Sequence, residues 1–158
     1  MSGWKLGLDG FVTHFMVSGP QEEPYFNEAK DKNQLRYEAY LRSAIAEHKP
    51  VGETGEILVG AKSRLNEEWK YYYDSGSCFV NISTFYSVMR RIHFDIATVL
   101  ETSSDIDVTA ALWSYAAVDV YCNGRLEGAL KQPVYKPIQK KELTLHLKAG
   151  RNLIYLAC

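Results

Sequence analysis

The sequence has little cysteine and no long apolar run. Its 158 residues include three cysteines, Cys78, Cys122 and Cys158. An odd number of cysteines at wide spacing fits neither a disulfide framework nor the paired spacing of a zinc site. The opening residues lack the apolar core of a secretory signal peptide, and no apolar run has the length that spans a membrane. These absences predict a cytoplasmic protein that has reduced thiols and makes no contact with a membrane.

An excess of charge of either sign is also missing. The net charge is −1, whereas a nucleic-acid-binding domain usually carries a basic stripe and a strongly positive charge. The basic residues that do cluster are typical of a solvated sheet edge, where lysine discourages aggregation. They are Lys136, Lys140, Lys141 and Lys148. The sequence therefore predicts no nucleic-acid partner.

Signatures of catalysis are absent as well. The chain has no Gly-x-Ser-x-Gly elbow and no His-Glu-x-x-His pair, and its four histidines are scattered. The segment Gly55–Ser63 approaches a phosphate-binding loop, but Ala61 is inserted between the glycine and the lysine. An added residue disturbs the converging backbone N–H groups that such a loop needs. We predict no catalytic residue, no metal ion and no cofactor in this chain.

Carboxylates occur in close pairs along the chain: Glu22 with Glu23, Glu67 with Glu68, and Asp105 with Asp107. A glycosidase needs two carboxyl groups across a cleft at a defined separation, which neighbouring residues do not demonstrate. We interpret these pairs as solvated surface. Calcium binding by Asp105 and Asp107 is the alternative for the third pair, because calcium prefers clustered oxygen ligands.

The strongest structural signal is the stretch Ala116–Leu130. Asn123-Gly124 is typical of a type I′ turn, in which both central residues need a positive φ. Before the turn, Ala116, Val118, Val120 and Cys122 alternate with Asp119 and Tyr121. This pattern predicts two antiparallel strands, which we place as the central hairpin of a sandwich.

Further short strands surround this hairpin. Continuous β structure is predicted from Val88, with a bulge at Ala97–Thr98 where the alternation loses phase. One-sided alternation is clear over Ile106–Leu112 and again over Leu143–Leu147, and a last strand follows at Leu153–Ala157. Short strands at regular spacing with polar turns indicate an antiparallel sandwich or barrel.

The first half of the chain mixes two patterns. Phe11–Ser18 is apolar on both faces and predicts a buried strand, which Gly19-Pro20 would end. Residues from Asp31 to Lys49 follow a near-helical spacing, and Pro50 stops it. We therefore expect one helix, inserted near the N-terminus at about residues 31–48.

Aromatic residues make up 13% of the chain, and 11 of them are tyrosine. Trp and Tyr pack against the apolar face of a sugar ring, while charged and amide side chains bond its hydroxyls. The alternatives are core packing for the tryptophans and surface filling for the tyrosines. The candidate carbohydrate-binding residues are Trp69, Tyr71, Tyr73, Trp113, Tyr115 and Arg125.

Three segments carry a resemblance to a known group. Leu112–Leu126, with Trp113 followed by Val-Asp-Val-Tyr-Cys-Asn-Gly, resembles the hairpin of galactose-binding-like jelly rolls. Such domains stand at the N-terminus of β-galactosidases, rhamnosidases and related enzymes. Leu143–Leu156 resembles a strand pair of the same fold, and His14–Pro20 looks like the strand that often precedes it. The resemblance implies an antiparallel jelly-roll β-sandwich, mainly β, as a single domain over residues 1–158.

The resemblance also implies a role. In that group the Asn-Gly turn is structural, and the domain is usually an accessory that binds sugar or packs on a catalytic neighbour. We therefore expect a non-catalytic domain of a larger glycoside-hydrolase-related protein, with carbohydrate and a downstream catalytic domain as partners. The apolar ending Leu156–Cys158 suggests that the chain continues. The alternative function is a small self-contained hydrolase that uses Glu67, Glu68 or His93.

Overall fold

A computed structural model of the chain describes residues 10–24, 57–73, 79–82, 90–131, 134 and 137–158. These residues form eight strands and no helix, so none of their elements is a helix able to cross a membrane. The expected helix at about residues 31–48 lies outside the described residues. The strands are β1 (His14–Pro24), β2 (Trp69–Tyr73), β3 (Arg90–Thr102), β4 (Ile106–Ser114), β5 (Val118–Cys122), β6 (Arg125–Leu130), β7 (Gln139–Leu147) and β8 (Gly150–Ala157).

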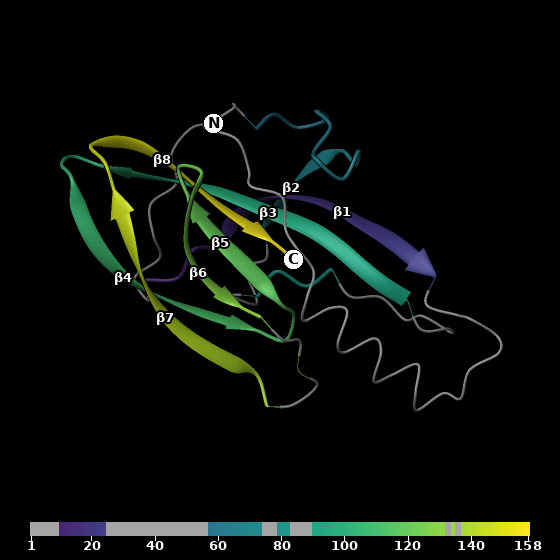
Figure 1. The fold of residues 1–158 in the computed structure, drawn as a ribbon. Coiled ribbons are helices and arrows are strands. Elements are labelled where there is room, and N and C mark those ends of the chain that lie inside the picture. Colours follow the sequence, from purple (N-terminus) through teal and green to yellow (C-terminus); the bar gives the residue numbers. More distant parts are fainter. Residues whose placement is uncertain (1–9, 25–56, 74–78, 83–89, 132–133, 135–136) are drawn as a thin grey trace.

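The strands form two antiparallel sheets. The larger has six strands in the order β2-β1-β3-β8-β5-β6, and β4 pairs with β7 in the smaller sheet. Figure 1 shows the β4–β7 pair lying over the β5–β6 end of the larger sheet, where β7 contacts both of those strands. The prediction of a mainly β, antiparallel, two-layer architecture is confirmed.

The main core lies between the two sheets. From β7, Leu143, Leu145 and Leu147 are buried against residues of the larger sheet such as Val120 and Ile154. The intervening residues of β7 are partly or fully exposed, so the one-sided alternation predicted there is confirmed. Burial of these apolar side chains is what holds the sheets together.

A second apolar cluster covers the outer face of the larger sheet. It contains Met16, Trp69, Ala97, Tyr121, Tyr155 and Ala157. The segment 57–68 packs over this face, with Ile57 against the cluster and Leu65 buried at 8% exposure. Both faces of the larger sheet are therefore apolar at its centre, which explains why all five residues of β5 are buried.

A buried polar network ties segment 57–68 to the sheet. The carboxylate of Asp95, fully buried in β3, accepts hydrogen bonds from Arg64 Nη2 at 2.6 Å and Nε at 3.0 Å. Its other oxygen accepts the Tyr155 hydroxyl at 2.7 Å. Burial, followed by the Asp95 charge, raises the pKa of Tyr155 far above its usual value. Nearby, the buried Ser18 hydroxyl donates to Ser63 Oγ and to the Glu67 carbonyl.

The predicted hairpin is present, although its position differs from the expectation. Asn123 and Gly124 have φ values of 50° and 80°, as a type I′ turn requires. Residues Val118, Val120 and Cys122 face the main core, while Tyr121 faces the outer cluster. The hairpin is not central, however, because β6 is an edge strand and β8 holds the middle of the sheet beside β3. The sequence pattern gives the pairing within a hairpin but not its order in the sheet.

Strand β1 does not end at Gly19-Pro20. The pair is accommodated as a bulge between Ser18 and Gln21, and pairing with β3 resumes from Gln21 to Pro24. Gly19 has a φ of 111°, and a Cβ there would lie 2.9 Å from the His93 carbonyl oxygen. Proline interrupts strand pairing only where the neighbouring strand needs a hydrogen bond from the backbone N–H that proline lacks. At a bulge the extra residue is unpaired, so that hydrogen bond is not needed.

The bulge expected at Ala97–Thr98 is absent. Pairing between β3 and β8 runs without a break from Asp95 to Thr102. The alternation loses phase in the sequence because Val99 and Leu100 are both apolar. A sheet with an apolar cluster on each face accepts apolar residues at successive positions without a bulge.

Candidate functional site

The predicted aromatic candidates lie in separate parts of the fold. Trp69 is buried at 4% exposure and meets Tyr155 edge to face, with ring centroids 5.8 Å apart. It belongs to the outer cluster, so the core-packing alternative describes it and its assignment to a sugar surface is wrong. Burial of that kind leaves no ring face for a ligand.

Tyr71 and Tyr73 are exposed on β2, at 47% and 51%. His14 of β1 stacks on Tyr73, with centroids 4.5 Å apart and planes 6° apart, and its Nδ1 contacts the Tyr71 hydroxyl. These three side chains form a small aromatic group at the β2 edge of the larger sheet. None of these three side chains lines the cavity described below.

Trp113 and Tyr115 lie at and just beyond the C-terminal end of β4. Trp113 is 37% exposed, Tyr115 is 51% exposed, and the Trp113 ring contacts Phe11 at a centroid distance of 6.1 Å. Lys140 Nζ lies 5.4 Å from the centroid of the Trp113 ring, within cation–π range. We call these residues the Trp113 patch: Phe11, Trp113, Tyr115 and Lys140.

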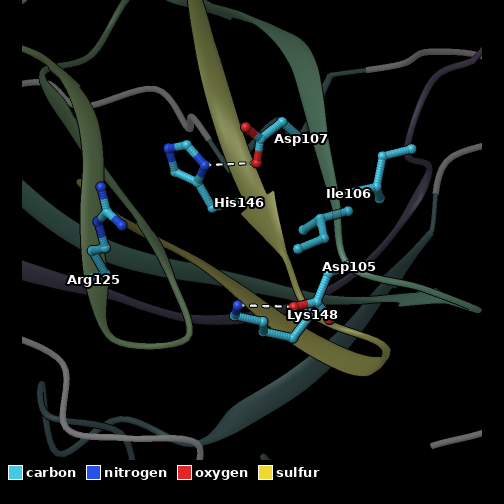
Figure 2. Close-up of a pocket in the computed structure, with 7 residues that line it drawn as sticks. Asp105, Ile106, Asp107, Arg125, His146 and Lys148 are labelled. Carbon is cyan, nitrogen blue, oxygen red and sulfur yellow. Dashed lines mark hydrogen bonds and ion pairs between the residues drawn. The ribbon is translucent and has the colours of Figure 1, made fainter.

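An open cavity of about 620 Å³ lies at the opposite end of β4 (Figure 2). Trp113 is far from it, since an extended strand from Ile106 to Trp113 spans roughly 23 Å. The cavity is formed where β4 begins and β7 ends, beside the turn between β5 and β6. Its lining residues are Asp105, Ile106, Asp107, Arg125, His146, Leu147 and Lys148. Of the six predicted carbohydrate-binding residues, only Arg125 lines this cavity.

One ion pair fixes the β7–β8 side of the cavity. Asp105 accepts hydrogen bonds from Lys148 Nζ at 2.9 Å and from the Ala149 backbone N–H at 2.8 Å. The Ala149 N–H and then the Lys148 ammonium lower the pKa of Asp105. The same pairing raises the pKa of Lys148. Both groups therefore remain charged over a wide range of pH.

A second contact joins the two strands of the smaller sheet. His146 Nδ1 lies 2.7 Å from Asp107 Oδ1, across the register pair of β4 and β7 (Figure 2). On the other side of the ring, Nε2 is 3.9 Å from Glu127 Oε2. The Glu127 side chain is 4% exposed, so it lies beneath the cavity rather than in it. His146 is thus held between two carboxylates.

Asparagine side chains join the two turns that frame the cavity. The fully buried Asn152 accepts from Asn123 Nδ2 and from the Lys148 N–H, each at 2.8 Å. Asn123 Oδ1 in turn accepts the Leu153 N–H at 2.9 Å. These bonds hold the β5–β6 turn, which leads into Arg125, against the β7–β8 turn, which carries Lys148. The Asn123 side chain therefore does more than permit a positive φ.

Sequence reasoning missed most of this cavity. The sequence predicts solvated surface, or calcium binding, for Asp105 and Asp107 and a solvated sheet edge for Lys148, and it gives no role to His146. The available signal was register: if Ile106–Leu112 pairs with Leu143–Leu147, then Asp107 stands opposite His146. That pairing requires knowing that two segments far apart in sequence are neighbours.

The calcium alternative for Asp105 and Asp107 finds no support among the described residues, which contain no group of three or more potential metal ligands. The oxygens of this pair bond instead to Lys148, Ala149 and His146. Glu67 and Glu68, proposed for the hydrolase alternative, are exposed in the segment before β2, and Glu68 pairs with Lys62 at 3.7 Å. Neither these two residues nor His93 lines the cavity.

Two of the three cysteines are described, and both are buried free thiols. Burial raises the pKa of Cys122 and, much more strongly, that of Cys158. A thiol with a raised pKa stays protonated and unreactive at neutral pH, which agrees with the structural role predicted for Cys122 and Cys158.

Comparison of the chain with protein-family models, with curated proteins and with solved structures finds no significant match. The functional argument therefore rests on the cavity and the exposed surfaces of the described residues.

Proposed function

We propose that this chain is a non-catalytic accessory β-sandwich domain of a carbohydrate-active protein, and that it contacts carbohydrate through the cavity beside the β5–β6 turn. The observation that carries the proposal is the lining of that cavity. Charged donors and acceptors from three elements surround a small apolar surface of Ile106 and Leu147. Ile106 is 48% exposed, so its side chain is accessible to a ligand in the cavity.

Sugars fit this chemistry. A sugar ring offers an apolar C–H face to side chains such as Ile106 and a rim of hydroxyls to Asp107, His146 and Lys148. Groups already fixed by ion pairs lose little side-chain entropy when a ligand binds, so their hydrogen bonds add to affinity. The Asp105–Lys148 and Asp107–His146 contacts provide that preorganisation.

The electrostatics favour binding over acid–base catalysis. A general acid or base works best when its pKa lies near the working pH. The pKa of Asp105 is lowered and the pKa of Lys148 is raised, so both pKa values lie further from neutral pH than usual. Such groups serve as permanently charged hydrogen-bonding partners.

The fold supports the family assignment within this proposal. A galactose-binding-like jelly roll has two antiparallel sheets and an Asn-Gly hairpin of the kind formed by β5 and β6. Leu143–Leu156, the segment that resembles a strand pair of that fold, spans β7 and β8, which lie in different sheets here. Fold alone leaves the function open, so the ligand must be tested directly.

A second candidate function is packing against another domain, and the Trp113 patch favours it. Phe11, Trp113 and Tyr115 expose aromatic surface about one strand length from the cavity. Aromatic residues and arginine are enriched at the centres of protein interfaces. The two roles use different surfaces, so a single domain can perform both.

Titration of the isotope-labelled chain with mono- and oligosaccharides, followed by amide NMR, tests the binding role. We expect shifts in residues of the β5–β6 and β7–β8 turns, and loss of those shifts in an Asp107→Asn, His146→Ala variant. A Tyr71→Ser variant is the matched control, because Tyr71 is exposed outside the cavity. If no sugar shifts these residues at millimolar concentration, the carbohydrate role is wrong and the packing role stands.

The hydrolase alternative has its own test. Release of the aryl alcohol from aryl-glycosides by the purified chain would overturn the non-catalytic assignment. Variants Glu67→Gln and Glu68→Gln would then identify the carboxyl groups that act.

A further inference from the structure

Arg125 is the cation of the cavity that makes no hydrogen bond to a described residue, and its ion pair with Glu127 is a long one. Its guanidinium Nε lies 3.9 Å from Glu127 Oε1, which is beyond hydrogen-bonding distance, and its side chain is 70% exposed. It stands at the first position of β6, immediately after the Asn123-Gly124 turn, and lines the cavity opposite His146 and Lys148 (Figure 2).

The other charges of the cavity are already matched. Asp105 bonds to Lys148 and to a backbone N–H, and Asp107 bonds to His146. Glu127 is buried behind the wall, with His146 and Arg125 each 3.9 Å away. The cavity therefore presents paired carboxylates and one exposed guanidinium that makes no hydrogen bond to a described residue.

We propose that the ligand is a singly charged acidic sugar, whose ring carboxylate is bound by Arg125. This inference rests on the proposed carbohydrate function and adds the class of sugar. Guanidinium donors match a carboxylate in a two-point arrangement, which gives direction as well as charge. Lys148 uses one of its three ammonium protons on Asp105, so it has donors left for a ring hydroxyl or the second carboxylate oxygen.

A monoanion suits the site better than the two alternatives. A phosphorylated sugar carries nearly two negative charges, so the carboxylates of Asp105, Asp107 and Glu127 would repel it more strongly than a monoanion. An amino sugar would place its ammonium among Arg125, Lys148 and His146, and both aspartates there are already bonded. A single carboxylate therefore suits the exposed guanidinium of Arg125 best.

The test compares galactose with two sugars that each differ from it at one carbon, galacturonate and galactosamine. Each is titrated into the full chain at neutral pH and followed by amide NMR, with acetate and galactose 6-phosphate as further arms. We expect galacturonate to bind about tenfold more tightly than galactose, which corresponds to about 1.4 kcal/mol. Substitution Arg125→Gln should remove this preference, so that galacturonate and galactose bind with equal affinity.

Arg151→Gln is the matched control, since Arg151 is an exposed arginine of β8 that does not line the cavity. It should leave the preference intact. Equal binding of galacturonate and galactose, or tighter binding of galactosamine or the phosphate, would overturn the acidic-sugar inference while the carbohydrate role survived. Acetate binding as tight as galacturonate would show simple anion binding and would also overturn it. If none of the sugars bound, the proposed function itself would fail.

Discussion

At the residue scale, Asn123 performs two tasks that are usually divided between residues. Its backbone adopts a φ of 50°, which asparagine tolerates better than most residues. Its side chain donates to Asn152 and accepts from the Leu153 N–H. The first task is visible in the sequence as an Asn-Gly pair. The second depends on β8 lying beside β5, so it required the structure.

Replacing Asn123 by glycine separates the two tasks. Glycine keeps the positive φ but removes both side-chain hydrogen bonds, so we expect the free energy of unfolding to fall by about 1–2 kcal/mol. Urea unfolding followed by circular dichroism measures the change. If the backbone requirement were the only reason for asparagine, Asn123→Gly would be neutral within a few tenths of a kcal/mol.

Asp105 gives a prediction about pH. Because its pKa is lowered in the folded protein, its ionised form stabilises the fold above the ordinary value of 3.8. That contribution disappears as the pH falls through the lowered pKa of the folded state. The difference in Tm between the wild-type chain and Asp105→Asn should therefore shrink between about pH 7 and about pH 3.

A Lys148→Met variant serves as the control for that experiment. The Ala149 N–H is the larger cause of the lowered pKa, and the Lys148 side chain is the second. Lys148→Met should therefore retain part of the pH dependence. Complete loss in this variant would mean that the ion pair, rather than the backbone N–H, sets the pKa.

At the scale of single elements, the pattern of alternation predicted which segments become strands. The cores of β4, β5 and β7 fall within segments predicted from alternation, and the last predicted strand, Leu153–Ala157, lies within β8. The errors came where the simple patterns fail. The adjacent apolar residues Val99 and Leu100 imitated a bulge, and Gly19-Pro20 imitated a strand end although it is itself a bulge.

The bulge in β1 explains why glycine stands at position 19. Its φ of 111° is unfavourable for any residue with a side chain, and a Cβ would lie 2.9 Å from the His93 carbonyl oxygen. We expect Gly19→Ala to destabilise the fold by about 2–4 kcal/mol, measured by denaturant unfolding.

Gly60→Ala is the comparison for this variant. Gly60 also has a positive φ, of 82°, but a Cβ there meets no atom within 4 Å. It should cost only about 1 kcal/mol, the typical cost of a left-handed backbone. Equal losses in the two variants would contradict a role for the close approach to β3.

The candidate site was less predictable than the strands. The hairpin placed Arg125 next to its turn, but the cavity needs β4 to pair with β7 and the β7–β8 turn to meet Asn123. Those are contacts between segments that local periodicity does not relate. Trp69 is of a residue type that is common on sugar-binding surfaces, but segment 57–68 packs over the outer cluster and makes Trp69 part of the core.

At the scale of the whole molecule, segment 57–68 covers the outer face of the larger sheet, so the centre of that sheet is buried on both faces. The Arg64–Asp95 pair is the polar attachment of that segment, and Asp95 is fully buried. Removing the cation leaves a buried carboxylate with only its remaining hydrogen bonds. The attachment therefore contributes more than an ion pair at the surface does.

Arg64→Ala should lower the free energy of unfolding by about 3 kcal/mol or more, measured by chemical denaturation. Lys62→Ala in the same segment is the control. Lys62 and Glu68 form an exposed pair at 3.7 Å, so its removal should change stability by no more than about 0.5 kcal/mol. Similar effects of the two variants would show that segment 57–68 is not held by its buried pair.

The place of β8 in the larger sheet has a consequence for synthesis of the chain. β8 follows the other seven strands in sequence, yet it lies between β3 and β5 and so joins the β2-β1-β3 half of the sheet to the β5-β6 hairpin. While the ribosome is still translating residues 150–157, the edges of β3 and β5 that will receive β8 have no strand between them. Exposed edges of this kind are prone to pair with other chains. We therefore expect the nascent polypeptide to be most prone to association with other chains until its eighth strand emerges.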